Sequence, residues 1–175
     1  MKWLLAVWLL SITYTAVAEH GPAEPPLSAE DKARLLKTMS EALRDKDITQ
    51  QQYDQSVSWV NATPCDGIDR ELTAHQKAQL EVAIAKQQKM KKITVYKSFK
   101  SNGWFIVFSD ASVGDSPYFF YAKNPIQGAK PVTAWSGAAT IFETSEVSEW
   151  VKKNAPGIPE KLANCFAWHV TISPE

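Results

Sequence analysis

Two short segments of this chain, residues 104–108 (WFIVF) and 118–121 (YFFY), are apolar at every position. Successive side chains of a β-strand point to opposite faces of the sheet, so a strand with one wet face alternates apolar and polar residues. Because these two segments do not alternate, strands formed by them need cover on both faces. They predict the centre of a sheet that is packed between helices or across an interface.

A strand and a tight turn are predicted immediately before the first apolar segment. Residues 92–100 alternate in polarity, with Ile93, Val95 and Phe99 on one predicted face. The Asn-Gly pair at 102–103 suits a two-residue hairpin turn because both residues tolerate the positive φ that the turn requires. We therefore expect an antiparallel hairpin whose second strand is the first apolar segment.

Further strands are predicted after the second apolar segment. Residues 132–135 and 138–142 are both candidates, or they form one strand that bends at 136–137. A glycine inside a strand pattern, here Gly137, indicates a bulge or a close approach of the backbone. Residues 165–172 predict a closing strand, with Phe166, Trp168 and Val170 on one face and Cys165, Ala167 and His169 on the other.

Helices are predicted on both sides of the sheet in sequence. A serine or threonine followed three residues later by an acid or a glutamine is typical of a helix N-terminus, and this pattern occurs at Ser28, Thr49 and Thr73. The first two predict a helical hairpin over residues 28–61, and Thr73 begins a third helix. A late helix is predicted to begin at 144–145.

These elements predict an α+β protein with a four- or five-stranded, mainly antiparallel sheet, one late helix and a closing strand. Residues 1–18 are interpreted as a secretory signal peptide and residues 19–27, rich in proline, as a tether. Residues 28–61 form the helical hairpin and residues 62–175 the sheet domain. The hairpin and the sheet domain are expected to form one globular unit.

The first 18 residues have the pattern of a secretory signal peptide, with Lys2 followed by an apolar run at 3–10 and small residues at 16–18. A membrane anchor is the alternative, but polar residues at 11–15 interrupt the run before the ~20 residues that a spanning helix needs. We expect cleavage, export to the periplasm or the medium, and no membrane span in the mature chain. Removing Lys2 leaves 18 basic and 19 acidic residues, a net charge of −1, which gives no electrostatic case for nucleic-acid binding.

The chain has two cysteines, Cys65 and Cys165, and in an oxidising compartment an even pair is typical of a disulfide. A catalytic thiol is the alternative. His169 follows Cys165 by four residues, and on the predicted closing strand the two lie roughly 13 Å apart, too far for a dyad. A structural bridge is therefore the favoured interpretation.

No sequence motif for catalysis or for a metal or phosphate site is present, and we expect no metal and no cofactor. Asp110 and Asp115 flank a serine-containing loop that could in principle hold a cation or an acid–base pair. The alternating acids of a calcium loop are absent there, so polar turn residues are the favoured interpretation. Six lysines form a run that suits either an anionic partner or, as favoured here, a solvated surface: Lys86, Lys89, Lys91, Lys92, Lys97 and Lys100.

The function that these features favour is that of an exported, non-enzymatic binding protein of the inhibitor or immunity type, acting on a protein partner. The predicted contact surface combines the hairpin at 101–104 with the loop at 109–117. Its predicted binding residues are Asn102, Trp104, Asp110, Asp115 and Tyr118. Two alternatives remain: a carrier that holds a small apolar ligand between the sheet and the helices, and an envelope hydrolase that uses Asp110 or Asp115 as its acid.

Overall fold

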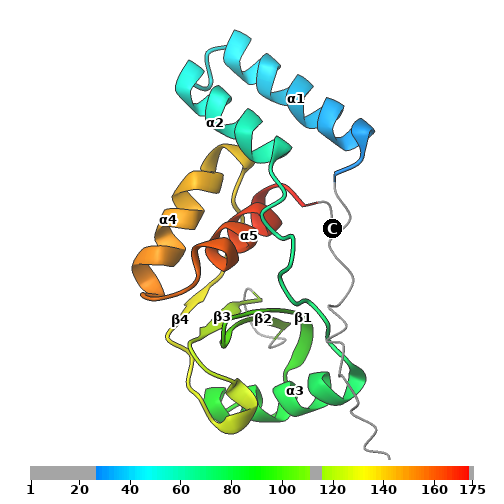
Figure 1. Cartoon of the computed structure of the whole chain (residues 1–175), viewed down its shortest axis with the longest axis vertical. Helices are drawn as coiled ribbons and strands as arrows, with labels where there is room; N and C mark the ends of the chain where they lie inside the picture. Colours follow the sequence, from blue (N-terminus) through cyan, green and yellow to red (C-terminus); the bar gives the residue numbers. More distant parts are fainter. Residues whose placement is uncertain (1–26, 111–115, 174–175) are drawn as a thin grey trace, which may run out of the picture.

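The computed structural model describes residues 27–110 and 116–173 of the chain (Figure 1). The predicted signal peptide at 1–18 and the tether up to residue 26 lie outside the described residues. The α-helices are α1 (Ala29–Arg44), α2 (Gln50–Asn61), α3 (Ala74–Gln88), α4 (Thr144–Asn154) and α5 (Glu160–Thr171). The strands are β1 (Thr94–Ser101), β2 (Trp104–Asp110), β3 (Tyr118–Tyr121) and β4 (Thr133–Trp135), with short 3-10 turns η1 (Pro125–Gln127) and η2 (Ile141–Glu143).

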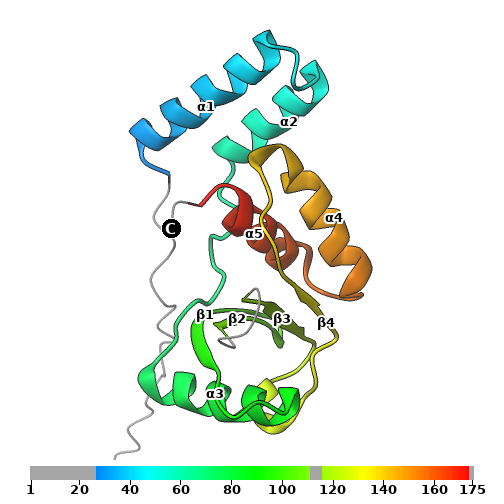
Figure 2. The ribbon, with the colours of Figure 1, turned by 180° about the vertical axis from the view of Figure 1, so that it is seen from behind.

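The four strands form one antiparallel sheet in the order β1-β2-β3-β4, which confirms the predicted α+β class. Helix α3 covers one face of the sheet, and α5, backed by α4, covers the other (Figures 1 and 2). The hairpin of α1 and α2 packs beyond α4 and α5, at the end of the molecule opposite α3. Within the described ranges, no helix is both long enough and apolar enough to cross a bilayer.

The core is divided by the sheet, as the two-sided apolar segments predict. On one face, Phe119 and Tyr121 of β3 pack with Leu80 and Ile84 of α3. On the other face, the core of the sheet is continuous with α4, α5 and the helical hairpin, and it includes Phe120. All four residues of β3 are buried, which explains why this strand carries only aromatic side chains.

The helix starts follow the capping signals. Thr49 and Thr73 each form a reciprocal capping box with the glutamine three residues later. The Ser28 hydroxyl accepts a hydrogen bond from the backbone N–H of Asp31. These side chains satisfy backbone donors that the first helical turn leaves without partners.

The β1–β2 hairpin has the predicted turn, since Asn102 and Gly103 have φ values of 48° and 81°. However, a β-bulge between Val95 and Lys97 inserts one extra residue into β1. The residues before the bulge therefore lie on the opposite face of the sheet from the one that regular alternation predicts. Val95 therefore packs on the α3 side of the sheet while Phe99 packs on the α5 side. The prediction that Val95 and Phe99 share one face is wrong for this reason.

The predicted closing strand at 165–172 is also wrong, because these residues belong to helix α5. Pro159 precedes the helix and Glu160 lies in its first turn, both of which favour a helix N-terminus. Seven of the twelve residues of α5 are buried. A helix that is buried to this extent does not show a regular alternation between an apolar face and a solvent-exposed face. A short apolar run of this kind cannot be assigned to a strand or to a buried helix from periodicity alone.

The strand predicted at 138–142 is not formed. The chain leaves the sheet after β4, and residues 141–143 form the 3-10 turn η2. Gly137 has φ 121° and no atom within 4 Å of the position that a Cβ would occupy, so it turns the chain rather than admitting a neighbouring backbone. The Glu143 carboxylate then accepts hydrogen bonds from the N–H and the hydroxyl of Thr140.

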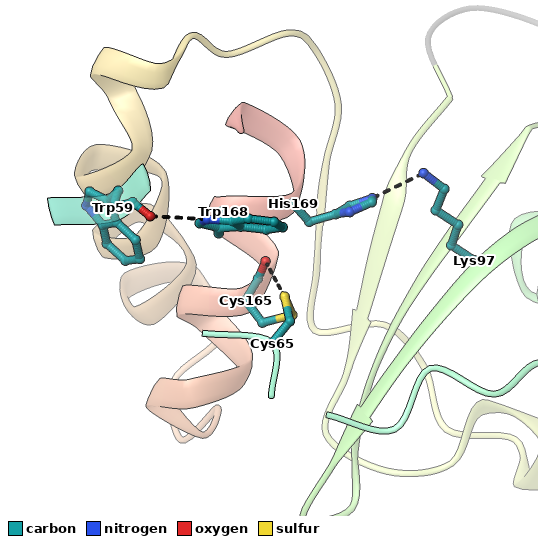
Figure 3. The surroundings of a disulfide bond; sticks show 6 residues. All are labelled: Trp59, Cys65, Lys97, Cys165, Trp168 and His169. Carbon is teal, nitrogen blue, oxygen red and sulfur yellow. Dashed lines mark hydrogen bonds between the residues drawn. A yellow bond between two sulfur atoms is a disulfide. The ribbon is translucent and has the colours of Figure 1, made fainter. Parts of the chain in front are cut away.

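Cys65 and Cys165 form a disulfide, with their Cα atoms 4.6 Å apart (Figure 3). It joins the segment that follows the helical hairpin to the middle of α5. Both residues are buried in the large core cluster. The bridge closes a loop of 100 residues, which contains the whole sheet.

Replacing both cysteines with serine (C65S/C165S) should lower the free energy of unfolding by about 4–5 kcal/mol, because the bridge restricts the unfolded chain over this long loop. Urea denaturation followed by circular dichroism measures the change. Reductant should destabilise the wild type by a similar amount and leave the double variant unaffected. Two free thiols on alkylation of the unreduced wild type, or equal stability of the two proteins, would contradict the assignment.

The fully buried Tyr121 should make stability fall at alkaline pH. Burial raises the pKa of its hydroxyl, which donates a hydrogen bond to Gln87 Oε1 over 3.2 Å. In the unfolded chain a tyrosine ionises near pH ~10, so above that pH the unfolded state binds fewer protons than the folded state and stability decreases as pH rises. Denaturation measured from neutral to alkaline pH should show a shallower decrease for Y121F than for the wild type. A Y121F slope equal to the wild-type slope would contradict the prediction.

Candidate ligand-binding site

A row of four side chains crosses the sheet on the face that α5 covers. Lys97 of β1 is paired with Phe108 of β2, Phe108 with Tyr118 of β3, and Tyr118 with Trp135 of β4. Neighbouring strands lie about 4.8 Å apart, so the row spans roughly 14 Å. It therefore forms a continuous strip with a cation at one end and an indole at the other.

A cavity of about 490 Å³ lies over this strip. The end of α5 lines it with His169, Val170 and Ser173. The segment that leaves the sheet after β4 lines it with residues 137–139, and Ser116 lines it beside β3. This volume is within the range of sites that bind small organic molecules.

The aromatic rings of the strip are in direct contact with one another. The rings of Phe108 and Tyr118 stack with their centroids 4.5 Å apart, and Tyr118 and Trp135 are tilted with centroids 6.0 Å apart. Phe166 of α5 packs edge-on against Tyr118 at 5.0 Å and against Trp135 at 5.5 Å. These mutual contacts hold the rings in place without a ligand, so the cavity wall is largely preformed.

The polar end of the cavity is formed by Lys97 and His169. Lys97 Nζ lies 3.4 Å from His169 Nε2 (Figure 3). A lysine ammonium has only donors, so Nε2 is the acceptor in this contact. The His169 ring is 7% exposed and also packs against Phe99, with the ring centroids 4.9 Å apart.

Helix α5 brings these groups together because the side chains of Trp168 and His169 point to different layers. The Trp168 indole points toward the helical hairpin and donates a hydrogen bond to the backbone oxygen of Trp59 over 3.2 Å. The His169 ring points the other way, toward Lys97 on the sheet. Cys165 lies one turn earlier and joins this part of the helix to Cys65.

The residues that the sequence predicts as a contact surface are divided between the two ends of β2. Asn102 is exposed in the hairpin turn and Trp104 begins β2, whereas Asp110 ends β2 and Tyr118 begins β3. The six steps along β2 separate the two groups by about 20 Å. Of these residues, Tyr118 lines the cavity, and Asp115 lies outside the described residues.

The sequence does not single out Lys97, Phe108, Trp135 or His169 as binding residues. One signal was present, because the Asn-Gly turn sets the register of the hairpin. Counting back from the turn pairs Lys97 with Phe108, as observed. His169 could not be found in this way, because its position depends on reading residues 160–171 as a helix.

Reading α5 as a helix also changes the spacing of Cys165 and His169. They are four residues apart on one helix and not 13 Å apart along a strand. Cys165 is nevertheless bonded to Cys65, so the sulfur is held in a structural bridge and not presented as a thiol. In the part of the chain that the structure describes, no three His, Cys, Asp or Glu side chains gather as a metal site requires.

The run of lysines does not act as one patch. Lys97 points into the cavity and Lys100 forms an ion pair with Asp69 at 3.1 Å. Lys86 and Lys89 at the end of α3, and Lys91 and Lys92 after it, are exposed. Lys97 is the lysine of this run that lies at the end of the aromatic strip.

Comparisons of the chain with protein-family models, with curated proteins and with solved structures gave no match. The cavity is therefore interpreted from its own geometry and chemistry.

The contact between Lys97 and His169 predicts which nitrogen of the imidazole carries the proton. In the neutral ring the acceptor is Nε2, so the proton should be on Nδ1. Nitrogen chemical shifts of the ¹⁵N-labelled side chain measure this directly. K97M should change the Nε2 shift of His169 and leave that of the exposed His75 unchanged. A ring protonated on Nε2 in the wild type at alkaline pH would contradict the geometry.

Proposed function

We propose that this chain is a non-enzymatic binding protein that holds a small organic ligand in the cavity between the sheet and α5. The supporting observation is the in-register strip of aromatic side chains under a cavity of about 490 Å³. Ligand sites are typically concave, mostly apolar and equipped with a few convergent polar groups. The aromatic strip supplies the apolar surface, and Lys97 with His169 supplies the polar groups.

We also propose that the protein works outside the cytoplasm, in the periplasm or the medium. The support is the signal-like pattern of residues 1–18 and the Cys65–Cys165 disulfide. Disulfides persist in oxidising compartments and are rare in the reducing cytosol. Each observation independently favours a location outside the cytoplasm.

A ligand carrier is better supported than an inhibitor that acts on a protein partner. The central residue of the predicted protein contact, Trp104, is 8% exposed and belongs to the large core cluster. Its ring also lies 3.9 Å from the position that a Cβ on Gly157 would occupy. An alanine at Trp104 would therefore report mainly on folding, and the cavity offers the more direct test.

The proposal predicts that protein purified from its native host or from a matched extract retains a small molecule. Native mass spectrometry should show a mass above that of the mature chain, and denaturing conditions should release the difference. Substitution of the cavity residue Ala138, which is exposed, with tryptophan should abolish the retained mass, because the indole takes up space that the ligand needs.

A122W is the matched control, since Ala122 is exposed just after β3 and does not line the cavity. It should retain the ligand as the wild type does. Thermal unfolding of all three proteins checks that the substitutions leave the fold intact. A wild type with the bare mature mass, together with no thermal shift across a library of small organic molecules, would overturn the proposed function.

A further inference from the structure

We propose that the ligand is an aromatic carboxylate, whose carboxylate binds Lys97 and whose ring lies along the aromatic strip. This inference rests on the proposed function and goes beyond it by naming the chemical class of the ligand. It follows from three properties of the cavity: its charge, the position of that charge and the nature of its walls.

The described residues that line the cavity carry positive charge. Among the described residues that line it, Lys97 is a full cation and none is an acid. The contact shown for its ammonium is with His169 Nε2, an imidazole nitrogen and not a carboxylate oxygen. Three other partly covered lysines of the described chain pair with carboxylates: Lys77 with Glu81 at 3.5 Å, Lys100 with Asp69 at 3.1 Å and Lys152 with Glu149 at 2.9 Å.

The donors of Lys97 match an oxyanion. An ammonium has three N–H donors, and the contact with His169 uses one of them. A carboxylate has two oxygens that accept, and hydrogen bonds between charged groups are stronger than those between neutral groups. A half-buried cation beside a buried ring is therefore well suited to bind a carboxylate that enters the cavity.

The position of the charge determines the shape of the ligand. Lys97 lies on the edge strand β1, and Trp135 lies on the opposite edge strand β4. A ligand with its carboxylate at Lys97 must extend over Phe108 and Tyr118 toward the indole. The stacked pair of rings and the tilted indole present faces and edges on which a flat ring packs favourably.

The test uses naphthoate and naphthamide, which share a ring system and differ in charge. Isothermal titration calorimetry should show naphthoate binding on the order of tenfold or more tighter than naphthamide. K97M should weaken naphthoate on the order of 10- to 100-fold, as expected for the loss of a hydrogen bond between charged groups, and leave naphthamide unchanged. W135A should weaken both compounds.

K92M is the matched control, because Lys92 is exposed and outside the cavity while the change in net charge is the same. It should leave both affinities at the wild-type value. Equal binding of the two compounds with no effect of K97M would overturn the carboxylate inference while leaving the proposed function intact. Absence of binding by both compounds would also overturn the inference. The retained mass and its loss in A138W test the proposed function separately.

Discussion

Both the sheet and the helical hairpin of this structure depend on helix α5, which lies between them. The central strands have apolar residues on two faces, and without cover on the second face they would expose a surface that aggregates. Phe166 meets that face with edge-on contacts to Tyr118 and Phe120. On its other side α5 receives the helical hairpin through the hydrogen bond from Trp168, and Cys165 attaches it covalently to Cys65. Because one short helix serves both neighbours, seven of its twelve residues are buried, as expected of a central helix.

The cavity follows from the way in which α5 ends. Phe166 packs against Tyr118 and Trp135 of the strip, but the helix stops at Thr171, and its last turn contributes His169 and the smaller Val170. The chain that leaves β4 is turned out of the sheet at Gly137, so no further strand of residues 27–110 and 116–173 closes the gap. The bulge in β1 is equally necessary, because it lets Lys97 share a face with Phe99 although Val95 packs on the opposite face. Bulges often re-aim side chains beside functional sites, and this one places a cation at the end of an aromatic surface.

Most of the fold could be predicted from local signals, and the failures have physical causes. Capping boxes, the Asn-Gly turn and the two-sided apolar strands act over a few residues, and the structure has all of them. The bulge could not be predicted because nothing in the composition of residues 92–100 distinguishes a bulged strand from a regular one. Helix α5 was misread because burial on all sides removes the helical period, and β-branched and aromatic residues then resemble a strand. Of the candidate site, Tyr118 was predicted as a binding residue, whereas His169 depends on the misread helix.

Lys97 also protects the edge of the sheet beside the open cavity. Lys97 lies on an edge strand, where a charge discourages pairing with another chain. On the α3 side of the same strand, Lys77 donates to the backbone oxygen of Val95 over 2.7 Å and Glu81 accepts from its N–H over 3.0 Å, so the edge is satisfied at the bulge. Side chains of α3 thus stabilise the distortion that turns Lys97 toward the cavity. The two layers that flank the sheet therefore act together on the site: α3 holds the bulge in shape, and α5 supplies the histidine that the lysine contacts.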